Sequence, residues 1–539
     1  MKLCRFFTQR REDKKYNSLF AYCSFFIITL NLFCLINQKQ TQTTIEPKYS
    51  GSQVAFDFPL NAEWINTNKP LSIKNLKGKI ILLYFWKPSC INCIHTLVDL
   101  KKLEKQWKEE LVLIGINSPK FLAEKNNDNL IHSILQNELE HAIIHDPNFL
   151  IWGQYQINAW PSFVLIDPKG LVFGIQSGED IYEGFNQIIS GMVEEYKKLN
   201  LISSSPISSL KPIVKSKSKQ LLSFPGKLTL NDIGSELFVS DSKHHRILRI
   251  DIKTKKIIDI IGNEKSGLID GNFKEAKFNN PQGLTIKNEF IYVADSENHC
   301  IREINLKTKK VKTLAGTGLQ ARSFNVPGKG KEVSFNSPWD LIEQKNKLYI
   351  TMKGSHQIWT LDLQTYESEV YAGSGSENLF DGKLQESSFA QPSGITKSQG
   401  KFFITDSEIS AIRSIDFKYS ELVSTIIGKG LFEFGDVDDS YPIARLQYPT
   451  GIYYNNGNLY VADTYNNKIK LVNPYEKTST TLAGNGKIGS QNGSFVDASF
   501  FEPSGVSGLK NKIYIADTNN HLIRVLDLDT KTVSNFDFQ

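Results

Sequence analysis

The sequence predicts a multidomain chain with an N-terminal membrane anchor, an α/β domain and an all-β propeller of six blades. Three observations predict this organisation. Residues 19–36 carry no charge, residues 54–200 alternate strand and helix patterns, and a unit of roughly 55 residues repeats six times from residue 221 to the end. A chain of 539 residues is too long for a single domain, so several are expected.

Charge and cysteine content narrow the classes of function. The formal net charge is +6, and the first fifteen residues hold six basic and two acidic side chains, a local excess of four (6 − 2). The remainder is nearly balanced, so no nucleic-acid partner is expected. The six cysteines do not form a disulfide framework, since three lie in or before the first apolar segment. They are Cys4, Cys23, Cys34, Cys90, Cys93 and Cys300.

The N-terminal region is predicted to anchor the chain in a membrane. Residues 1–18 form a basic segment and residues 19–36, LFAYCSFFIITLNLFCLI, just reach the length of a span. The positive-inside rule places the N-terminus in the cytoplasm, so both domains lie outside it, in the periplasm if the source is bacterial. Residues 37–53 are polar and are expected to form a tether. A cleaved signal peptide is the alternative.

The α/β domain spans residues 54–200. Ile80–Trp86 and Leu111–Asn117 are apolar runs of strand length, Phe121–Glu140 is predicted helical, and Ala142–His145 is a short strand. A hairpin turn at Asp167–Gly170 and an amphipathic helix at Ile181–Leu199 follow. This alternation predicts a central sheet covered by helices.

A Cys-x-x-Cys motif stands where the strand Ile80–Trp86 passes into a helix. Pro88 and Ser89 break the strand, and apolar residues recur at helical spacing beyond Cys93. Unpaired N–H groups and the dipole at a helix N-terminus favour a thiolate, so Cys90 is the expected nucleophile. Cys93, one turn on, would resolve the mixed disulfide. Half a zinc site and an inert buried pair are the alternatives.

Residues 54–200 resemble a thioredoxin-like domain of the redoxin and membrane-anchored thioredoxin type. The resemblance rests on Gly78-Lys79, Phe85-Trp86, Cys90-x-x-Cys93, Trp160-Pro161-Ser162-Phe163 and Asp167-x-x-Gly170. It implies that Cys90 and Cys93 form a redox-active disulfide. It also implies that Pro161 follows a cis peptide bond facing the cysteines, and that Trp160 and Pro161 help to bind the substrate. No cofactor or metal is expected.

A Ser-, Lys- and Pro-rich linker, residues 201–220, leads to the repeats at 221–539. Each unit opens on a proline-containing turn and has a strand with an acidic end, followed by further strands, which predicts four strands per blade. The strand ends are assigned to Asp241, Asp295, Thr351, Asp406, Asp463 and Asp517. Recurrence in nearly every blade favours an architectural role for these aspartates. Blade three departs at Thr351, Lys353 and Gly354.

The units resemble NHL repeats, most clearly at Asp295-x-x-Asn298-x-x-Ile301-Arg302 and Asp517-x-x-Asn520-x-x-Ile523-Arg524. An Asp/Asn-Gly pair recurs between blades, at Asp270-Gly271, Asp381-Gly382 and Asn492-Gly493. The order of domains resembles chains of the NHL-repeat-containing protein 2 type. Among the histidines, only His244-His245 has a spacing that could hold a metal, and Cys300 is expected in the core.

Three functions remain open. The first is an anchored thiol–disulfide oxidoreductase with a protein disulfide or dithiol as substrate and a protein partner on the propeller. The second is a non-catalytic scaffold with a relic thioredoxin fold, which is motivated by Ser89, Asn92 and the lack of an acid in Ile80–Trp86. The third is a metal-dependent propeller hydrolase or lyase.

Overall fold

The computed structural model describes residues 47–213, 220–323 and 325–539. Residues 47–539 form one compact unit that contains both the α/β domain and the propeller. No helix within the described ranges is long and apolar enough to cross a membrane. The predicted anchor at residues 19–36 and its basic flank lie outside those ranges, so the anchor stays a prediction.

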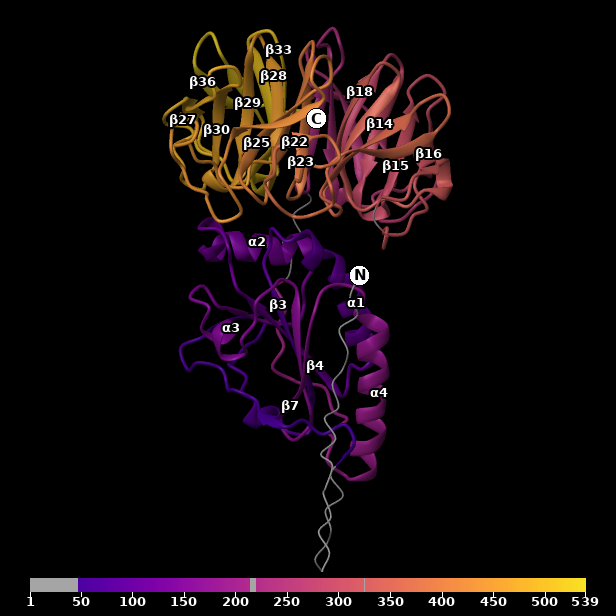
Figure 1. Cartoon of the computed structure of the whole chain (residues 1–539), viewed down its shortest axis with the longest axis vertical. Coiled ribbons are helices and arrows are strands. Elements are labelled where there is room, and N and C mark those ends of the chain that lie inside the picture. Colours follow the sequence, from indigo (N-terminus) through magenta and orange to yellow (C-terminus); the bar gives the residue numbers. More distant parts are fainter. Residues whose placement is uncertain (1–46, 214–219, 324) are drawn as a thin grey trace, which may run out of the picture. The chain divides into compact units, whose positions relative to one another are not determined.

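The α/β domain is built on one seven-stranded sheet with strand order β1-β7-β6-β3-β4-β5-β2 (Figure 1). Its strands are β1 (Gln53–Val54), β2 (Glu63–Ile65), β3 (Ile80–Trp86), β4 (Leu111–Asn117), β5 (Ala142–His145), β6 (Ser162–Ile166) and β7 (Leu171–Ser177). Its helices are α1 (Ile91–Gln106), α2 (Asn127–Asn137), α3 (Leu150–Gln154) and α4 (Tyr182–Lys198). β3 pairs parallel with β4 and antiparallel with β6.

β3 is buried along its whole length because both faces of the sheet are covered. Leu82 and Tyr84 belong to the apolar cluster that includes α1 and α4, whereas Ile81 and Leu83 belong to the opposite cluster. The alternation of side chains along a strand therefore feeds two cores from one apolar run. The strand, and the helix that follows it, are placed as the sequence predicts.

Two segments differ from the predictions. The helix expected over 121–140 is a one-turn segment, Ala123–Lys125, followed by α2, because Asn126 caps α2 by accepting a hydrogen bond from the Asp128 N–H at 2.8 Å. Residues 201–213 of the predicted linker are largely exposed, but part of this segment pairs with the α/β domain. Leu210 bridges to Thr67, and Ile213 N–H donates to Asn66 at 2.9 Å.

The propeller has six antiparallel blades. Blade one holds β8 (Pro225–Leu230), β9 (Glu236–Asp241), β10 (Arg246–Asp251) and β11 (Lys256–Ile261). Blade two holds β12 (Gly271–Asn272), β13 (Pro281–Lys287), β14 (Phe290–Asp295), β15 (Cys300–Asn305) and β16 (Lys310–Ala315). Blade three holds β17 (Gly328–Lys329), β18 (Pro338–Gln344), β19 (Lys347–Met352), β20 (Gln357–Asp362) and β21 (Glu367–Ala372).

Blade four holds β22 (Gly382–Lys383), β23 (Pro392–Lys397), β24 (Lys401–Asp406), β25 (Ala411–Asp416) and β26 (Leu422–Ile427). Blade five holds β27 (Asp439–Ser440), β28 (Gly451–Asn455), β29 (Asn458–Asp463), β30 (Lys468–Asn473) and β31 (Thr478–Ala483). Blade six holds β32 (Gly493–Ser494), β33 (Pro503–Leu509), β34 (Lys512–Asp517), β35 (Leu522–Asp527) and β36 (Thr532–Asn535). The predicted four strands are present in every blade, and blades two to six gain a two-residue outer strand.

In blades two, four and six the outer strand begins at the glycine of the recurring Asp/Asn-Gly pair. Gly271 pairs with Val311 in β16 and has a φ of 152°, a conformation that favours glycine. The ring closes where β33 of blade six packs against β8 of blade one, with the Thr518 hydroxyl donating to Pro225 O at 2.8 Å. Among the described residues none adds such an outer strand to blade one, and Ile257 N–H at its outer edge donates instead to Gln539 O at 2.8 Å.

The aspartates at the strand ends hold the blades together. Asp295 accepts a hydrogen bond from Asn279 N–H at 2.7 Å and pairs with Arg302 at 2.7 Å. Arg302 also reaches Asp270 at 3.0 Å, so it ties the outer strand to the blade. This bonding agrees with the architectural role, although the backbone group that Asp295 caps lies before the first strand.

In blade three the assignment of Thr351 to this position is wrong. Pro338 pairs with Met352, as Pro281 pairs with Asp295. A methionine therefore replaces the aspartate, and Trp359 stands where blade two has an arginine.

Candidate functional site

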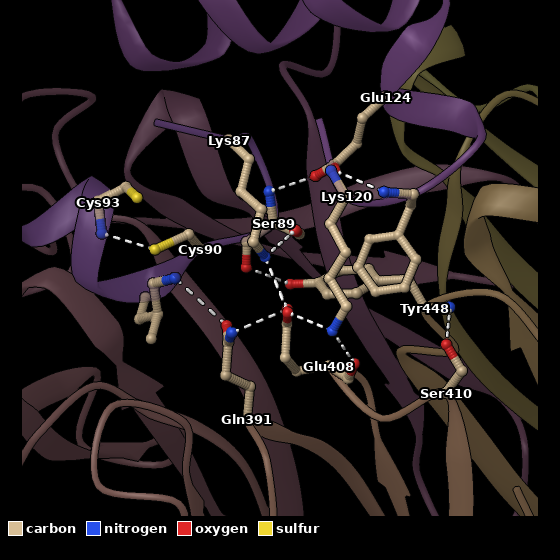
Figure 2. A network of polar contacts seen from close by, with 12 residues as sticks. Lys87, Ser89, Cys90, Cys93, Lys120, Glu124, Gln391, Glu408, Ser410 and Tyr448 are labelled. Atoms are coloured by element: carbon tan, nitrogen blue, oxygen red, sulfur yellow. Dashed lines mark hydrogen bonds and ion pairs between the residues drawn. The ribbon is translucent and has the colours of Figure 1, made fainter. Parts of the chain in front are cut away.

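The two cysteines lie at the junction of β3 and α1. Cys90 is the N-cap residue of α1, and its Sγ accepts a hydrogen bond from Cys93 N–H at 3.1 Å (Figure 2). Both side chains are free thiols. Cys90 is 5% exposed and Cys93 is 0% exposed. An N–H donor at a helix N-terminus stabilises negative charge on the sulfur it contacts, so the geometry favours Cys90 as the attacking sulfur.

The inner thiol is held in its protonated form. Burial, together with the hydrogen bond and charge of Cys90, raises the pKa of Cys93 well above its usual range. The Tyr84 hydroxyl donates to Cys93 O at 2.8 Å and fixes this turn of the helix against β3. The pair is chemically unequal, with an outer sulfur that can attack and an inner sulfur that can act second.

Trp160 and Pro161 lie at the same end of the sheet. The Trp160–Pro161 peptide is cis, as the resemblance implied. Because Ser162 pairs with Phe85, Pro161 lies beside the end of β3. The Trp160 ring lies 5.5 Å from Lys87 Nζ. The pairing of β3 with β6 thus places Trp160 and Pro161, the predicted substrate-binding residues, at the end of the sheet where the two cysteines lie.

The propeller contacts the backbone on both sides of Cys90. The Gln391 side-chain oxygen accepts a hydrogen bond from Ile91 N–H at 3.2 Å, and the Tyr448 hydroxyl donates to Ser89 O at 3.0 Å (Figure 2). These two propeller residues bond to the polar backbone groups that flank Cys90. Sequence reasoning missed them, since no local pattern distinguishes either from an ordinary loop residue.

A buried ionic cluster joins the two domains beside the cysteines. Glu408 of the propeller pairs with Lys87 at 2.9 Å and with Lys120 at 2.7 Å. Burial opposes the charge of Glu408, but the two ammonium groups outweigh it and lower the Glu408 pKa. For Lys87, Glu408, Glu124 and Cys90 likewise outweigh burial and raise its pKa. A lysine directly after a buried strand was the one available sign of this cluster.

A cavity of about 640 Å³ lies between the α/β domain and the propeller. Ser89 and Ile91, on either side of Cys90, line it, and so does Lys353. Lys353 is buried, with its Nζ 3.9 Å from the centre of the Trp339 ring and 5.3 Å from that of Tyr448. Burial lowers the pKa of Lys353 to about 7, against the opposing effect of Glu408.

His95, His244 and Cys300 contact protein groups that account for their positions. His95 contacts Ser337 at 2.7 Å and Glu179 at 3.2 Å, and no group of three or more His, Cys, Asp or Glu in the described part of the chain could hold a metal. His244 bonds to Asp241 at 2.8 Å. Cys300 is buried as expected, and burial raises its pKa to about 12.

Comparisons with known proteins define the class. The thioredoxin-like family model matches residues 78–172, and the NHL-repeat model matches residues 278–304 and 446–470. The chain therefore joins a thioredoxin-like domain to an NHL-repeat propeller.

Relatives extend this match over most of the chain. The chain is 39% identical over 516 residues to NHL repeat-containing protein 2 of Bos taurus, and the aligned region covers 89% of this chain and 71% of the relative. The chain belongs to the family of NHL repeat-containing protein 2. It is also 36% identical to Protein SUPPRESSOR OF QUENCHING 1, chloroplastic, of Arabidopsis thaliana, over 92% of this chain and 48% of that protein. Protein DipZ of Mycobacterium bovis is 32% identical over 28% of this chain and 22% of its own length.

Proposed function

We propose that the protein is a thiol–disulfide oxidoreductase whose active site is covered by its own propeller. The observation that carries the proposal is the inequality of the two thiols. Cys90 Sγ accepts the Cys93 N–H at the start of α1, whereas Cys93 is fully buried. The thioredoxin-like domain, and the position of Pro161 beside the end of β3, support the same proposal.

The reaction follows from these roles. The Cys90 thiolate attacks one sulfur of a substrate disulfide, and the other sulfur leaves as a thiolate. Cys93 then loses its proton and attacks Cys90 Sγ, releasing the second substrate thiolate. The protein dithiol is oxidised to the Cys90–Cys93 disulfide, and one substrate disulfide is reduced to two thiols.

The test uses the reduced full chain and the neutral reagent 2-hydroxyethyl disulfide. We expect Cys90→Ser to lower the rate of thiol oxidation at least 100-fold, and Cys93→Ala to accumulate a mixed disulfide on Cys90, seen by mass spectrometry. Cys300→Ser, which removes a buried thiol in blade two, is the matched control and should leave the rate unchanged.

A scaffold without catalysis is the second candidate. The observation in its favour is that the propeller covers the cysteine face, through Gln391 and Tyr448. If no reagent oxidises Cys90 and Cys93 in the folded protein, the scaffold is the better account.

A further inference from the structure

One position facing the α/β domain breaks the propeller repeat. In five blades the residue after the buried strand-end aspartate is a serine or threonine, and its hydroxyl donates to a proline carbonyl of the next blade at 2.5–2.8 Å. These residues are Ser242, Ser296, Ser407, Thr464 and Thr518. Blade three has Lys353 there, directly after Met352. An ammonium group replaces a hydroxyl that links blades elsewhere.

Lys353 is a buried cation without a carboxylate partner. It is 5% exposed, and within the described ranges no residue forms an ion pair or a hydrogen bond with its Nζ. Two aromatic rings, Trp339 and Tyr448, supply only cation–π contacts. A buried ammonium without a counter-charge is costly, so the site favours an anion.

The space beside Lys353 is large enough for a ligand. The cavity of about 640 Å³ lies in the range of small-molecule sites. On the propeller side Lys227 pairs with Asp340 at 3.5 Å and bonds to Thr450 O at 2.6 Å. Lys227 and Asp340 satisfy one another, whereas Lys353 has no such ion pair within the part of the chain that the structure describes.

The same cavity reaches the residues next to the nucleophile. Ser89 and Ile91, the two chain neighbours of Cys90, line it together with Lys353. Tyr448 and Gln391 already bond to the backbone groups of Ser89 and Ile91, so these two groups are not free to pair with an extended protein substrate. A small molecule needs neither group.

We propose that Cys90 acts on a low-molecular-mass disulfide bearing a carboxylate, which enters the cavity and places that carboxylate against Lys353. This inference rests on the proposed function and names its substrate class. The electron balance is that of the reaction above, with two small carboxylate-bearing thiols as products. The α/β domain supplies the sulfur chemistry and blade three supplies the charge that selects the substrate.

Three disulfides of similar length and different charge test the proposal on the full chain. They are 3,3′-dithiodipropionate, which is anionic, 2-hydroxyethyl disulfide, which is neutral, and cystamine, which is cationic. We expect the anionic reagent to oxidise the dithiol at least tenfold faster than the neutral one, and the cationic reagent to be the slowest.

Lys353→Ser, which installs the residue type of the other blades, should abolish this preference. Lys383→Met, on the outer strand of blade four with a 77% exposed side chain, removes a charge elsewhere and should keep the preference. Equal rates for the three reagents in the wild type overturn the inference but leave the proposed function standing. No reaction with any of them overturns the proposed function.

Binding without redox chemistry gives an independent measurement. Suberate has the length and charge of dithiodipropionate but no sulfur. It should raise the melting temperature of the wild type and of Cys90→Ser by several degrees, and leave Lys353→Ser unmoved. A suberate shift that survives in Lys353→Ser would place the anion elsewhere and overturn the inference.

Discussion

Blades two and three have the same strand pattern but differ at the positions that decide what a blade does. In blade two, Asp295 and Arg302 form a fully buried ion pair at 2.7 Å. In blade three, Met352 and Trp359 occupy the corresponding positions in an apolar cluster. The ionic pair is therefore one of two solutions to the same packing problem. Lys353, which faces the cavity, also differs from the other blades, but within the described residues no hydrogen bond of its side chain replaces the one that a hydroxyl makes there. We therefore expect Lys353 to have a functional role.

The largest effect should follow from breaking the ionic pair of blade two. Arg302→Leu leaves Asp295 buried without its cation, and Asp270 loses its tie to the blade. We expect the free energy of unfolding to fall by about 3–5 kcal/mol, measured by urea denaturation, because an uncompensated charge remains in the interior.

Arg322→Leu is the matched control for this change. Arg322 pairs with Asp180 at 3.0 Å, but its side chain is 76% exposed. Removing an exposed pair should change stability by less than about 1 kcal/mol. A similar loss in both variants would mean that the buried pair has no special role.

A smaller effect should follow from removing a glutamate that stands at the same position in blades two and four but has different partners in each. Glu297 of blade two pairs with Lys243 of blade one at 3.1 Å, whereas Glu408 of blade four pairs with Lys87 and Lys120 of the thioredoxin-like domain. Glu408→Gln should weaken the contact between domains by about 2–3 kcal/mol, the scale of a hydrogen bond to a charged group.

The readout is access to Cys90. Alkylation of Cys90 by a bulky maleimide should become at least tenfold faster in Glu408→Gln, since the propeller would leave the cysteine face more often. Glu297→Gln is the control and should keep the slow rate. If both variants react as slowly as the wild type, Glu408 does not hold the propeller against the thioredoxin-like domain.

Transplanting the apolar pair sharpens the comparison of the two blades. Arg302 stacks on Phe278 at 5.0 Å, and Trp359 contacts Phe335 at 5.8 Å, so the two pairs have the same kind of aromatic neighbour. Asp295→Met combined with Arg302→Trp should cost only about 1–2 kcal/mol, because no charge is left unpaired.

A double-mutant cycle measures the coupling. The double variant should be more stable than Arg302→Trp alone. If the costs of the two single changes simply add, the apolar pair of blade three is not an alternative to the ion pair.

Sequence patterns predicted the fold because its elements depend on local periodicity. β3 spans Ile80–Trp86, as the apolar run indicated, and α4 lies within one residue of the predicted helix. The one misplaced repeat position, Thr351 for Met352, failed because the expected aspartate is absent and only strand pairing fixes the register.

The site was only half predictable. Cys90 and Cys93 form a motif within one turn of chain. Gln391, Glu408 and Tyr448 bond instead to residues next to this motif, from about 300 residues or more away in the sequence. Contacts over such separations depend on how two domains dock, which no periodicity encodes. The departure at Lys353 was visible in the sequence, whereas its burial against two aromatic rings was not.

The smallest effect is a pH dependence that depends on blade three alone. Burial lowers the Lys353 pKa to about 7, Glu408 and Cys90 oppose this effect, and Lys227 and Lys87 add to it. The lysine is an ammonium below that pH and a neutral amine above it.

The ratio of the rate constants for dithiodipropionate and 2-hydroxyethyl disulfide should therefore fall several-fold between pH 6 and 8. The attack by Cys90 is common to both reactions, so its own pH dependence cancels in the ratio. In Lys353→Ser the ratio should be flat, because a serine does not titrate. A flat ratio in the wild type would mean that the charge selecting the substrate does not belong to Lys353.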